Sequence, residues 1–223
     1  MATNTKTIWQ IVDLTAVCAL QSLGSTGSLL LNGTLVDNSI PNQISFISNN
    51  FIRSVSITSG QNLSSTTFTV SGIQNGAFVT ENITGPNNNT VYGLNYYDII
   101  TSVIANAAIA APGVSVGTGK VGYLPLVQVN NSNASSYINY SCSVLLPAGS
   151  GINYSLLQTL EKVNNNWIPL QTQNTIFFPS MGLTNQTTSQ IGNSTIIVSY
   201  LLLHINSSTT PLTDTLTFIF TQA

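Results

Sequence analysis

The chain has 223 residues, and only 4 are Lys or Arg and 6 are Asp or Glu, so 4% of it is charged where an ordinary soluble domain has about 25%. So few basic residues exclude the clustered Lys and Arg that neutralise phosphates, and we expect no direct binding of nucleic acid. Because 43% of the residues are hydrophobic and no run approaches the roughly 20 apolar residues of a membrane span, the composition also argues against a disordered chain and a membrane protein.

Residues 1–24 are expected to form an N-terminal arm or a short helix. Gln10 and Asp13 interrupt what would be the apolar region of a signal peptide, so we expect no secretion signal. Residues at helical spacing, followed by two glycines as stop signals, favour the helix: Ile8, Ile11, Val12, Thr15 and Ala19, then Gly24 and Gly27.

Residues 25–120 are expected to form a first β domain, because from Leu29 the hydrophobic period changes to two. The clearest hairpin lies around Asn75-Gly76, a dipeptide that tolerates the positive φ angles of a type I′ turn. Its strands would place Phe68 and Val70 on one side and threonines on the other. The expected strands are LLLNGTLV at 29–36, ISFI at 44–47, FIRSVSIT at 51–58, TTFTVSGI at 66–73, AFVTENIT at 77–84 and YYDIITSVIAN at 96–106.

Glycines concentrate between Gly113 and Gly122, which we interpret as the last strand of this domain and a short linker. Residues 121–223 then form a second β domain, with turns at 147–149 and 164–166. Many short strands indicate an all-β fold of two antiparallel β-sandwich or jelly-roll-like domains. Strand-like segments are LPLVQV at 124–129, SYINYSCSVLL at 136–146, INYSLLQTLEKV at 152–163, NWIPLQ at 166–171, NTIFF at 174–178, STIIVSYLLLHI at 194–205 and DTLTFIFTQA at 214–223.

The block from Ile52 to Lys120 resembles a family of virion-associated β proteins of tailed bacteriophages. Its members share a "VTITS" strand, an "FTVTG" strand, an "ETITGPN" hairpin end and a closing "VSVGT". The matching segments here are SVSITS at 54–59, FTVSG at 68–72, ENITGPN at 81–87, YYDIITSVI at 96–104 and VSVGT at 114–118, with LLLNGTL at 29–35 and TLTFIFTQA at 215–223 similar to the opening and closing strands.

The resemblance implies a non-enzymatic capsid decoration or cement protein on the exterior of a virion, assembled in the host cytoplasm. Its partners would be the major capsid protein and copies of itself, as a dimer or trimer. A head-to-tail or tail component is the first alternative. The resemblance carries no catalytic residues, and edge strands without lysine guards would accept a partner strand.

The titratable residues predict no catalytic, cofactor or metal site. His204 lies in a strand pattern with Tyr200 and Leu202, and no G-x-S-x-G motif supports a Ser/His/Asp arrangement with Asp98 or Asp214. No cluster of His, Cys or carboxylates suits zinc or calcium. The carboxylates are interpreted as solvated turn residues or caps: Asp13, Asp37, Glu81, Asp98, Glu161 and Asp214.

The cysteines, aromatic residues and asparagines each allow a structural or a functional interpretation. Cys18 and Cys142 are expected as free, buried thiols. Aromatics that could line a carbohydrate-binding face are interpreted as core: Tyr92, Tyr96, Tyr97, Trp167, Phe177 and Phe178. A second alternative, an archaeal or bacterial surface filament or adhesin subunit, would carry glycans on its N-x-S/T sites, and a third, a glycan-degrading tail enzyme, would need an acidic pair such as Asp98 and Glu81. The N-x-S/T asparagines are Asn32, Asn62, Asn82, Asn88, Asn130, Asn133, Asn139, Asn153, Asn185, Asn193 and Asn206.

Overall fold

A computed structural model describes most of the chain. The described residues are 3–9, 12–36, 42–46, 52–74, 76–124, 127–128, 138–159, 178–196, 200–208 and 216–222. Across these ranges the secondary structure consists of β-strands, bridges and turns, arranged in antiparallel sheets. The prediction of an all-β, sandwich-like fold is therefore confirmed.

The chain divides into two compact units, one of which interrupts the other in sequence. The inserted unit is Val12–Gly122. The terminal unit combines Met1–Ile11 with Tyr123–Ala223. This division differs from the expected arm, first domain and second domain, because the two parts of residues 1–24 belong to different units.

The expected N-terminal helix is wrong, because strands occupy both of its ends. Strand β1, Thr3–Trp9, pairs antiparallel with β17, Leu216–Gln222. Strand β2, Cys18–Leu23, pairs with β10, Ile109–Tyr123. Threonine alternates through β1 and favours extended backbone, and the Asp13 carboxylate accepts the Thr15 N–H in a local turn that competes with a helix.

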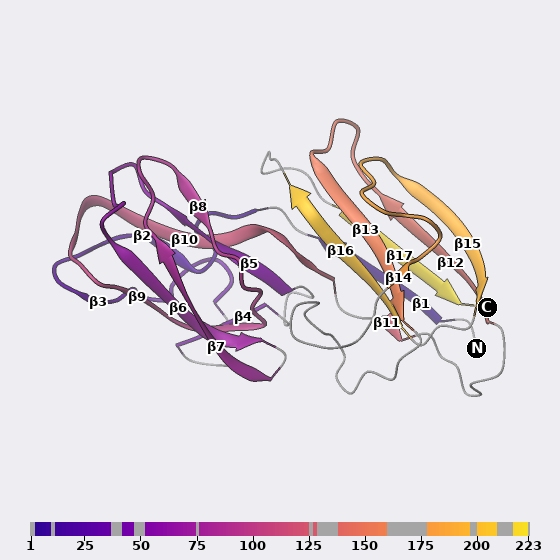
Figure 1. Cartoon of the computed structure of the whole chain (residues 1–223), viewed down its shortest axis with the longest axis horizontal. Helices are drawn as coiled ribbons and strands as arrows, with labels where there is room; N and C mark the ends of the chain where they lie inside the picture. Colours follow the sequence, from indigo (N-terminus) through magenta and orange to yellow (C-terminus); the bar gives the residue numbers. More distant parts are fainter. Residues whose placement is uncertain are drawn as a thin grey trace. The chain divides into compact units, whose positions relative to one another are not determined.

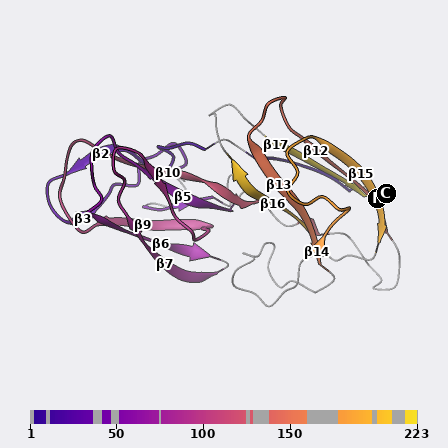
Figure 2. The same ribbon diagram turned by 45° about the horizontal axis from the view of Figure 1, so that its top comes forward.

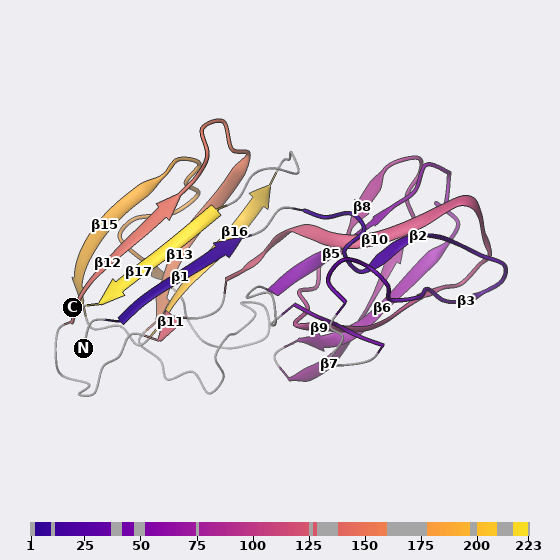
Figure 3. The ribbon, with the colours of Figure 1, turned by 180° about the vertical axis from the view of Figure 1, so that it is seen from behind.

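The terminal unit contains two groups of hydrogen-bonded strands. One has the order β1-β17-β12-β15 (Figure 3), and the other has the order β14-β13-β16 with β11 also on β16. The two groups meet where the Tyr140 hydroxyl lies 3.1 Å from the Ser180 hydroxyl. The remaining strands are β11 Val127–Gln128, β12 Ile138–Leu145, β13 Ile152–Thr159, β14 Phe178–Pro179, β15 Gln190–Ile196 and β16 Tyr200–Ser208.

The terminal unit differs from the sequence prediction at one strand and agrees with it at one turn. The segment STIIVSYLLLHI forms no single strand, because β15 ends at Ile196 and β16 begins at Tyr200 in the other group of strands. The turn at Pro147–Gly149 is confirmed by the Ser150 N–H, which donates to the Pro147 carbonyl. The expected NWIPLQ strand and the 164–166 turn lie outside the described residues.

The inserted unit also contains two groups of strands (Figures 1 and 2). One has the order β3-β9-β6-β7 with β4 on β9, and the other contains β10-β5-β8 with β2 on β10. The groups face each other across a core, since Ile83 of β7 and Val55 of β5 both approach Gly93. The strands are β3 Gly27–Ser28, β4 Ile44–Ser45, β5 Ile52–Thr58, β6 Thr67–Gln74, β7 Ala77–Thr84, β8 Thr90–Tyr92 and β9 Ile99–Ala105.

The β6–β7 hairpin is confirmed in register. Gln74 pairs with Ala77 across a two-residue connection, and Gly76 has a φ of 75°. Phe68 and Val70 are fully buried, whereas Thr67 and Thr69 on the other side of β6 are half-buried. The alternation therefore gives the sheet one core face and one outer face.

The expected strand at 29–36 is wrong, because side chains replace part of the backbone ladder there. The Gln21 amide accepts the Leu30 N–H at 2.9 Å and donates to the Leu30 carbonyl at 3.0 Å. The Asn32 side-chain oxygen accepts the Ala19 N–H at 2.9 Å. These amides satisfy backbone groups that a neighbouring strand would otherwise pair.

The last strand expected at Gly113–Gly122 is present as part of β10, a strand of 15 residues, but the short linker expected in the same stretch is not, because the strand continues through all of it. A Cβ on Gly117 would lie 2.0 Å from the Asp13 carbonyl oxygen, and one on Gly119 would lie 2.0 Å from the Ser54 hydroxyl. These glycines therefore serve close backbone approach rather than flexibility.

Replacing Gly117 with Ala is expected to destabilise the inserted unit by about 1–3 kcal/mol, since the new methyl group would overlap fixed backbone atoms. Urea denaturation followed by circular dichroism measures the change. Gly60→Ala is the matched control, because no atom lies within 4 Å of its Cβ position. Equal urea midpoints for Gly117→Ala and Gly60→Ala would contradict the close approach of Gly117 to the Asp13 backbone.

Candidate functional site

The outer face of β7, β6 and β9 is the candidate functional surface, and we call it the uncharged face. The cross-strand register places its residues in rows, such as Thr80–Ser71–Ser102 and Asn82–Thr69–Ile104. None of its members is charged. The uncharged face consists of Thr67, Thr69, Ser71, Ile73, Phe78, Thr80, Asn82, Thr84, Ile99, Ser102 and Ile104.

Polar side chains on this face hold one another in place. The Thr69 hydroxyl donates to the Asn82 side-chain oxygen at 2.9 Å. The hydroxyls of Ser71 and Thr80 lie 3.4 Å apart, and the Thr101 hydroxyl donates to the Ser71 carbonyl at 3.2 Å beside a bulge in β9. Cross-strand bonds of this kind order side chains before any partner arrives, which lowers the entropic cost of binding.

Large apolar side chains stand at two ends of the uncharged face. Phe78 is 69% exposed and lies opposite Ile73, which lies opposite Ile99. Ile104 is 38% exposed at the far end of the rows. A largely exposed phenylalanine loses its contact with water only when another surface covers it, so Phe78 makes this face a candidate contact surface.

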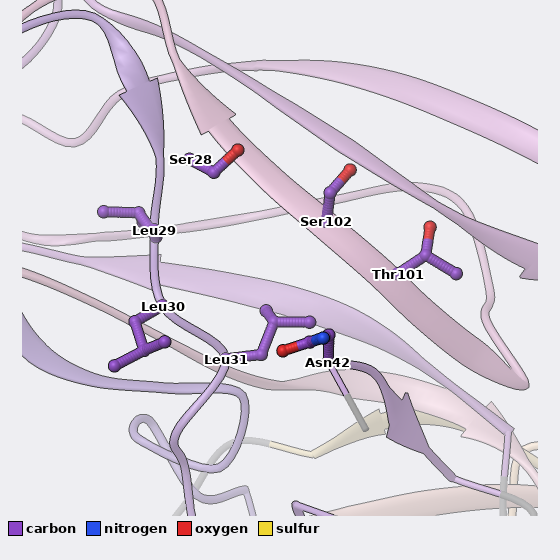
Figure 4. Close-up of a pocket in the computed structure, with 7 residues that line it drawn as sticks. All are labelled: Ser28, Leu29, Leu30, Leu31, Asn42, Thr101 and Ser102. Atoms are coloured by element: carbon purple, nitrogen blue, oxygen red, sulfur yellow. The ribbon is translucent and has the colours of Figure 1, made fainter. Parts of the chain in front are cut away.

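A pocket of about 200 Å³ opens beside the uncharged face (Figure 4). It lies along the edge of β9 where the neighbours among the described residues are two short strands, β3 paired with residues 104–105 and β4 paired with residues 99–100. Residues 29–31 line it on one side, where the Leu31 side chain is apolar, and Thr101 and Ser102 line it from β9. The pocket therefore suits an apolar group that also tolerates hydroxyl neighbours.

The described carboxylates of the inserted unit serve the fold, and only some match the expected solvated turns or caps. Asp13 is a cap, because it accepts the Thr15 N–H and the hydroxyls of Thr15 and Thr34. Burial raises its pKa, but these hydrogen bonds and the Arg53 charge outweigh burial and leave the pKa lowered. Asp98 is wrongly predicted as solvated, since its side chain is completely buried.

Glu81 lies within strand β7 and binds backbone instead of facing a substrate. Its carboxylate accepts the N–H groups of Leu94 at 2.5 Å and Asn95 at 3.3 Å, and the Tyr97 hydroxyl donates to it at 3.4 Å. Burial, then the Glu81 charge, raises the pKa of Tyr97. The Glu81 carboxylate is thus engaged by three donors, which holds the 94–95 turn against β7.

His204 is a packed side chain of the terminal unit. Its ring stacks on Tyr123 with centroids 4.6 Å apart. Burial lowers its pKa to about 4, and a hydrogen bond with Asn206 partly opposes this shift. Asp98 lies in the other unit and Asp214 outside the described residues. Tyr123 is the neighbour that sequence spacing could not reveal, because it lies 81 positions away.

The predicted free, buried thiols and the aromatic core are confirmed where they are described. Cys18 and Cys142 are free and buried, and burial raises the pKa of each thiol to about 12. Tyr96 and Tyr97 belong to the core, whereas the half-buried Tyr92 ring lies under the Lys120 ammonium at 4.6 Å. The side chains of five further sequence candidates are not among those described: Asp37, Glu161, Trp167, Phe177 and Phe178.

The N-x-S/T asparagines differ in what their side chains contact. The Asn206 amide nitrogen lies 2.7 Å from the Asn153 side-chain oxygen, 2.8 Å from the Ser155 hydroxyl and 3.0 Å from the Asn185 side-chain oxygen. Asn130 and Asn133 lie outside the described residues. Exposed members are Asn32, Asn62, Asn82, Asn88, Asn139, Asn185 and Asn193.

Within the described ranges, no three His, Cys, Asp or Glu residues gather in a way that could hold a metal ion. The same part of the chain contains no helix long and apolar enough to cross a membrane. The sequence matches no protein-family model and no curated protein. The geometry of the uncharged face therefore carries the functional argument.

The pKa of His204 gives a direct test of its packing. It is the only histidine of the chain, so a single imidazole signal in an NMR titration should report a pKa of about 4. A signal titrating near the ordinary value of 6.5 would show that the ring is not packed as described.

The same shift predicts a pH dependence of stability. The folded state binds fewer protons than the unfolded state between pH 6.5 and about 4, so the stability from neutral His204 is complete above pH 6.5 and is lost as pH falls to about 4. The loss should be roughly 3 kcal/mol. Urea denaturation over this range should show a smaller pH dependence for His204→Phe than for the unaltered chain.

Proposed function

We propose that this chain is a structural protein of a virus particle, a decoration or cement protein that binds the capsid lattice and copies of itself. The observation that carries the proposal is the uncharged face, with ordered hydroxyl and amide groups and exposed apolar residues at its ends. The resemblance of residues 52–120 to phage virion proteins supports the same role. A head-to-tail or tail position uses the same chemistry.

Contact through uncharged groups has a physical advantage in a permanent assembly. Removing an ion from water is expensive and is compensated only by good pairing. Threonine, serine and asparagine form hydrogen bonds in an interface without that penalty. Such contacts also depend little on ionic strength, because screening acts on charges. A particle exposed to different salt concentrations would therefore keep subunit contacts of this kind.

The terminal unit offers a second contact surface. β15 stands at one end of the strand order β1-β17-β12-β15, and no residue of Gln190–Ile196 is charged. Ile191 is 76% exposed on this strand, and Leu145 is 41% exposed on the neighbouring β12. Edge strands that lack charged guards accept a partner strand. A decoration protein needs two such surfaces, one for the lattice and one for another subunit.

Cryo-electron microscopy of particles purified from a culture that carries this sequence tests the proposal. Density for the chain in regular contact with capsid subunits is expected. Thr80→Lys/Asn82→Lys should lower incorporation at least 10-fold, since each lysine would be buried without a partner. Ser22→Lys/Ser25→Lys is the control, because both of these serines are exposed outside the uncharged face. Particles that lack the chain would refute the role.

A glycosylated surface filament or adhesin subunit remains the second candidate, and the exposed N-x-S/T asparagines favour it. This candidate predicts glycans on some of the asparagines and not on others. A glycan takes one hydrogen of the side-chain nitrogen, so Asn206, whose nitrogen faces three oxygens, should stay unmodified while exposed Asn193 carries sugar. Mass spectrometry of peptides from the native source decides between the candidates, because a virion protein made in a cytoplasm would carry no sugar at either position.

A further inference from the structure

We infer that two copies of this chain pack their uncharged faces together, with Phe78 of each copy seated in the Leu30–Ser102 pocket of the other. The inference rests on the proposed function and names the partner of the uncharged face. Its basis is the position, size and chemistry of the pocket in relation to one exposed aromatic side chain.

Phe78 and the pocket lie on opposite sides of the same face. Phe78 belongs to β7, the last strand of the order β3-β9-β6-β7, whereas the pocket lies at the β9 edge beside β3. A two-fold axis that runs along β6 would therefore place β7 of one copy over β9 of its partner. Both copies then insert the same side chain into the same pocket, as a two-fold contact requires.

The register puts the two features at similar heights along the strands. Phe78 lies opposite Ile73, and Ile73 lies opposite Ile99, so Phe78 and Ile99 are at the same height along the strands. The pocket residues Thr101 and Ser102 lie further along β9, within about 7 Å of strand length from Ile99. Packed sheets cross at about 30°, which displaces an outer strand by several Å along the strand that it covers. The remaining offset is of that order.

The volume and the lining of the pocket fit a phenyl ring. The pocket measures about 200 Å³, and an apolar protein cavity of about 150 Å³ accommodates benzene. Figure 4 shows the Leu31 side chain beside Asn42, on the side of the pocket toward Thr101, so Leu31 provides the apolar side-chain contact, and Thr101 and Ser102 line the pocket from β9. An aromatic anchor in a preformed pocket is typical of the residues that dominate interface energy.

The strength of the contact follows from its size. The three strands of the uncharged face, of seven or eight residues each, cover roughly 14 by 24 Å, or about 700 Å² for two copies. This area is smaller than that of standard specific complexes and corresponds to a weak contact. We therefore expect a dimer with a dissociation constant in the micromolar range, which binding to a common lattice would reinforce through effective concentration.

A charge exchange between anchor and pocket tests the pairing. Phe78→Asp and Ser102→Lys should each weaken the dimer at least about 30-fold, the effect of losing a dominant interface residue. Mixing the two variants should restore a heterodimer, because one junction then pairs Asp with Lys and the other keeps Phe78 in an unaltered pocket. Sedimentation equilibrium, with one variant carrying an affinity tag, measures both results.

Leu94→Asp is the matched control, since Leu94 is 78% exposed and lies outside the uncharged face. This variant should dimerise like the unaltered chain. Circular dichroism confirms that each variant folds. Monomeric behaviour of the unaltered chain into the high micromolar range, or a mixture that does not recombine, would overturn the inference. If the chain is found in particles but does not dimerise, the proposed function stands and the inference fails. If the chain dimerises but is absent from particles, the inference stands and the proposed function fails.

Discussion

The structure depends on satisfying buried and half-buried polar groups almost without ions. Side-chain amides and hydroxyls do this where charged pairs would serve in other proteins. The Gln21 amide replaces two backbone partners of Leu30, and the Asn206 amide contacts three oxygens from two segments, β13 and the turn at Asn185. Each of these side chains can both donate and accept, or offers two hydrogens, so one residue fixes several segments. The same chemistry, turned outward, produces the uncharged face.

The sequence predicts the strands best where burial alternates and loops are short. The β6–β7 hairpin was predictable because period, Asn-Gly turn and exposed threonines agree on one register. The N-terminal strand β1 was not, because its partner β17 lies more than two hundred residues away. Between Gly113 and Gly122 the strand was predictable, but the linker added to it was wrong, since composition alone does not distinguish flexibility from close approach to a neighbouring backbone.

The candidate site, too, could be predicted from the sequence only in part. Low charge is visible in the sequence, and it predicts neutral contact surfaces. The pocket is not visible, because it lies along an edge of β9 where the neighbours among the described residues are two short strands, β3 and β4. Burial of Asp98 was also not predictable, since a carboxylate near the start of a predicted strand was expected in solvent and is completely buried. Tertiary packing decides such positions, and local pattern does not.

The pairing of β1 with β17 has a mechanical consequence. Thr3 lies opposite Gln222, and the pairing then runs inward to Trp9 and Leu216, so both strands enter the sheet from the same end. A force that pulls the two ends apart would load these hydrogen bonds one after another, from the outermost pair inward. Shearing would require all of them to break together. The pairing of β1 with β17 would thus open one residue pair at a time, at a lower tension than shearing would need.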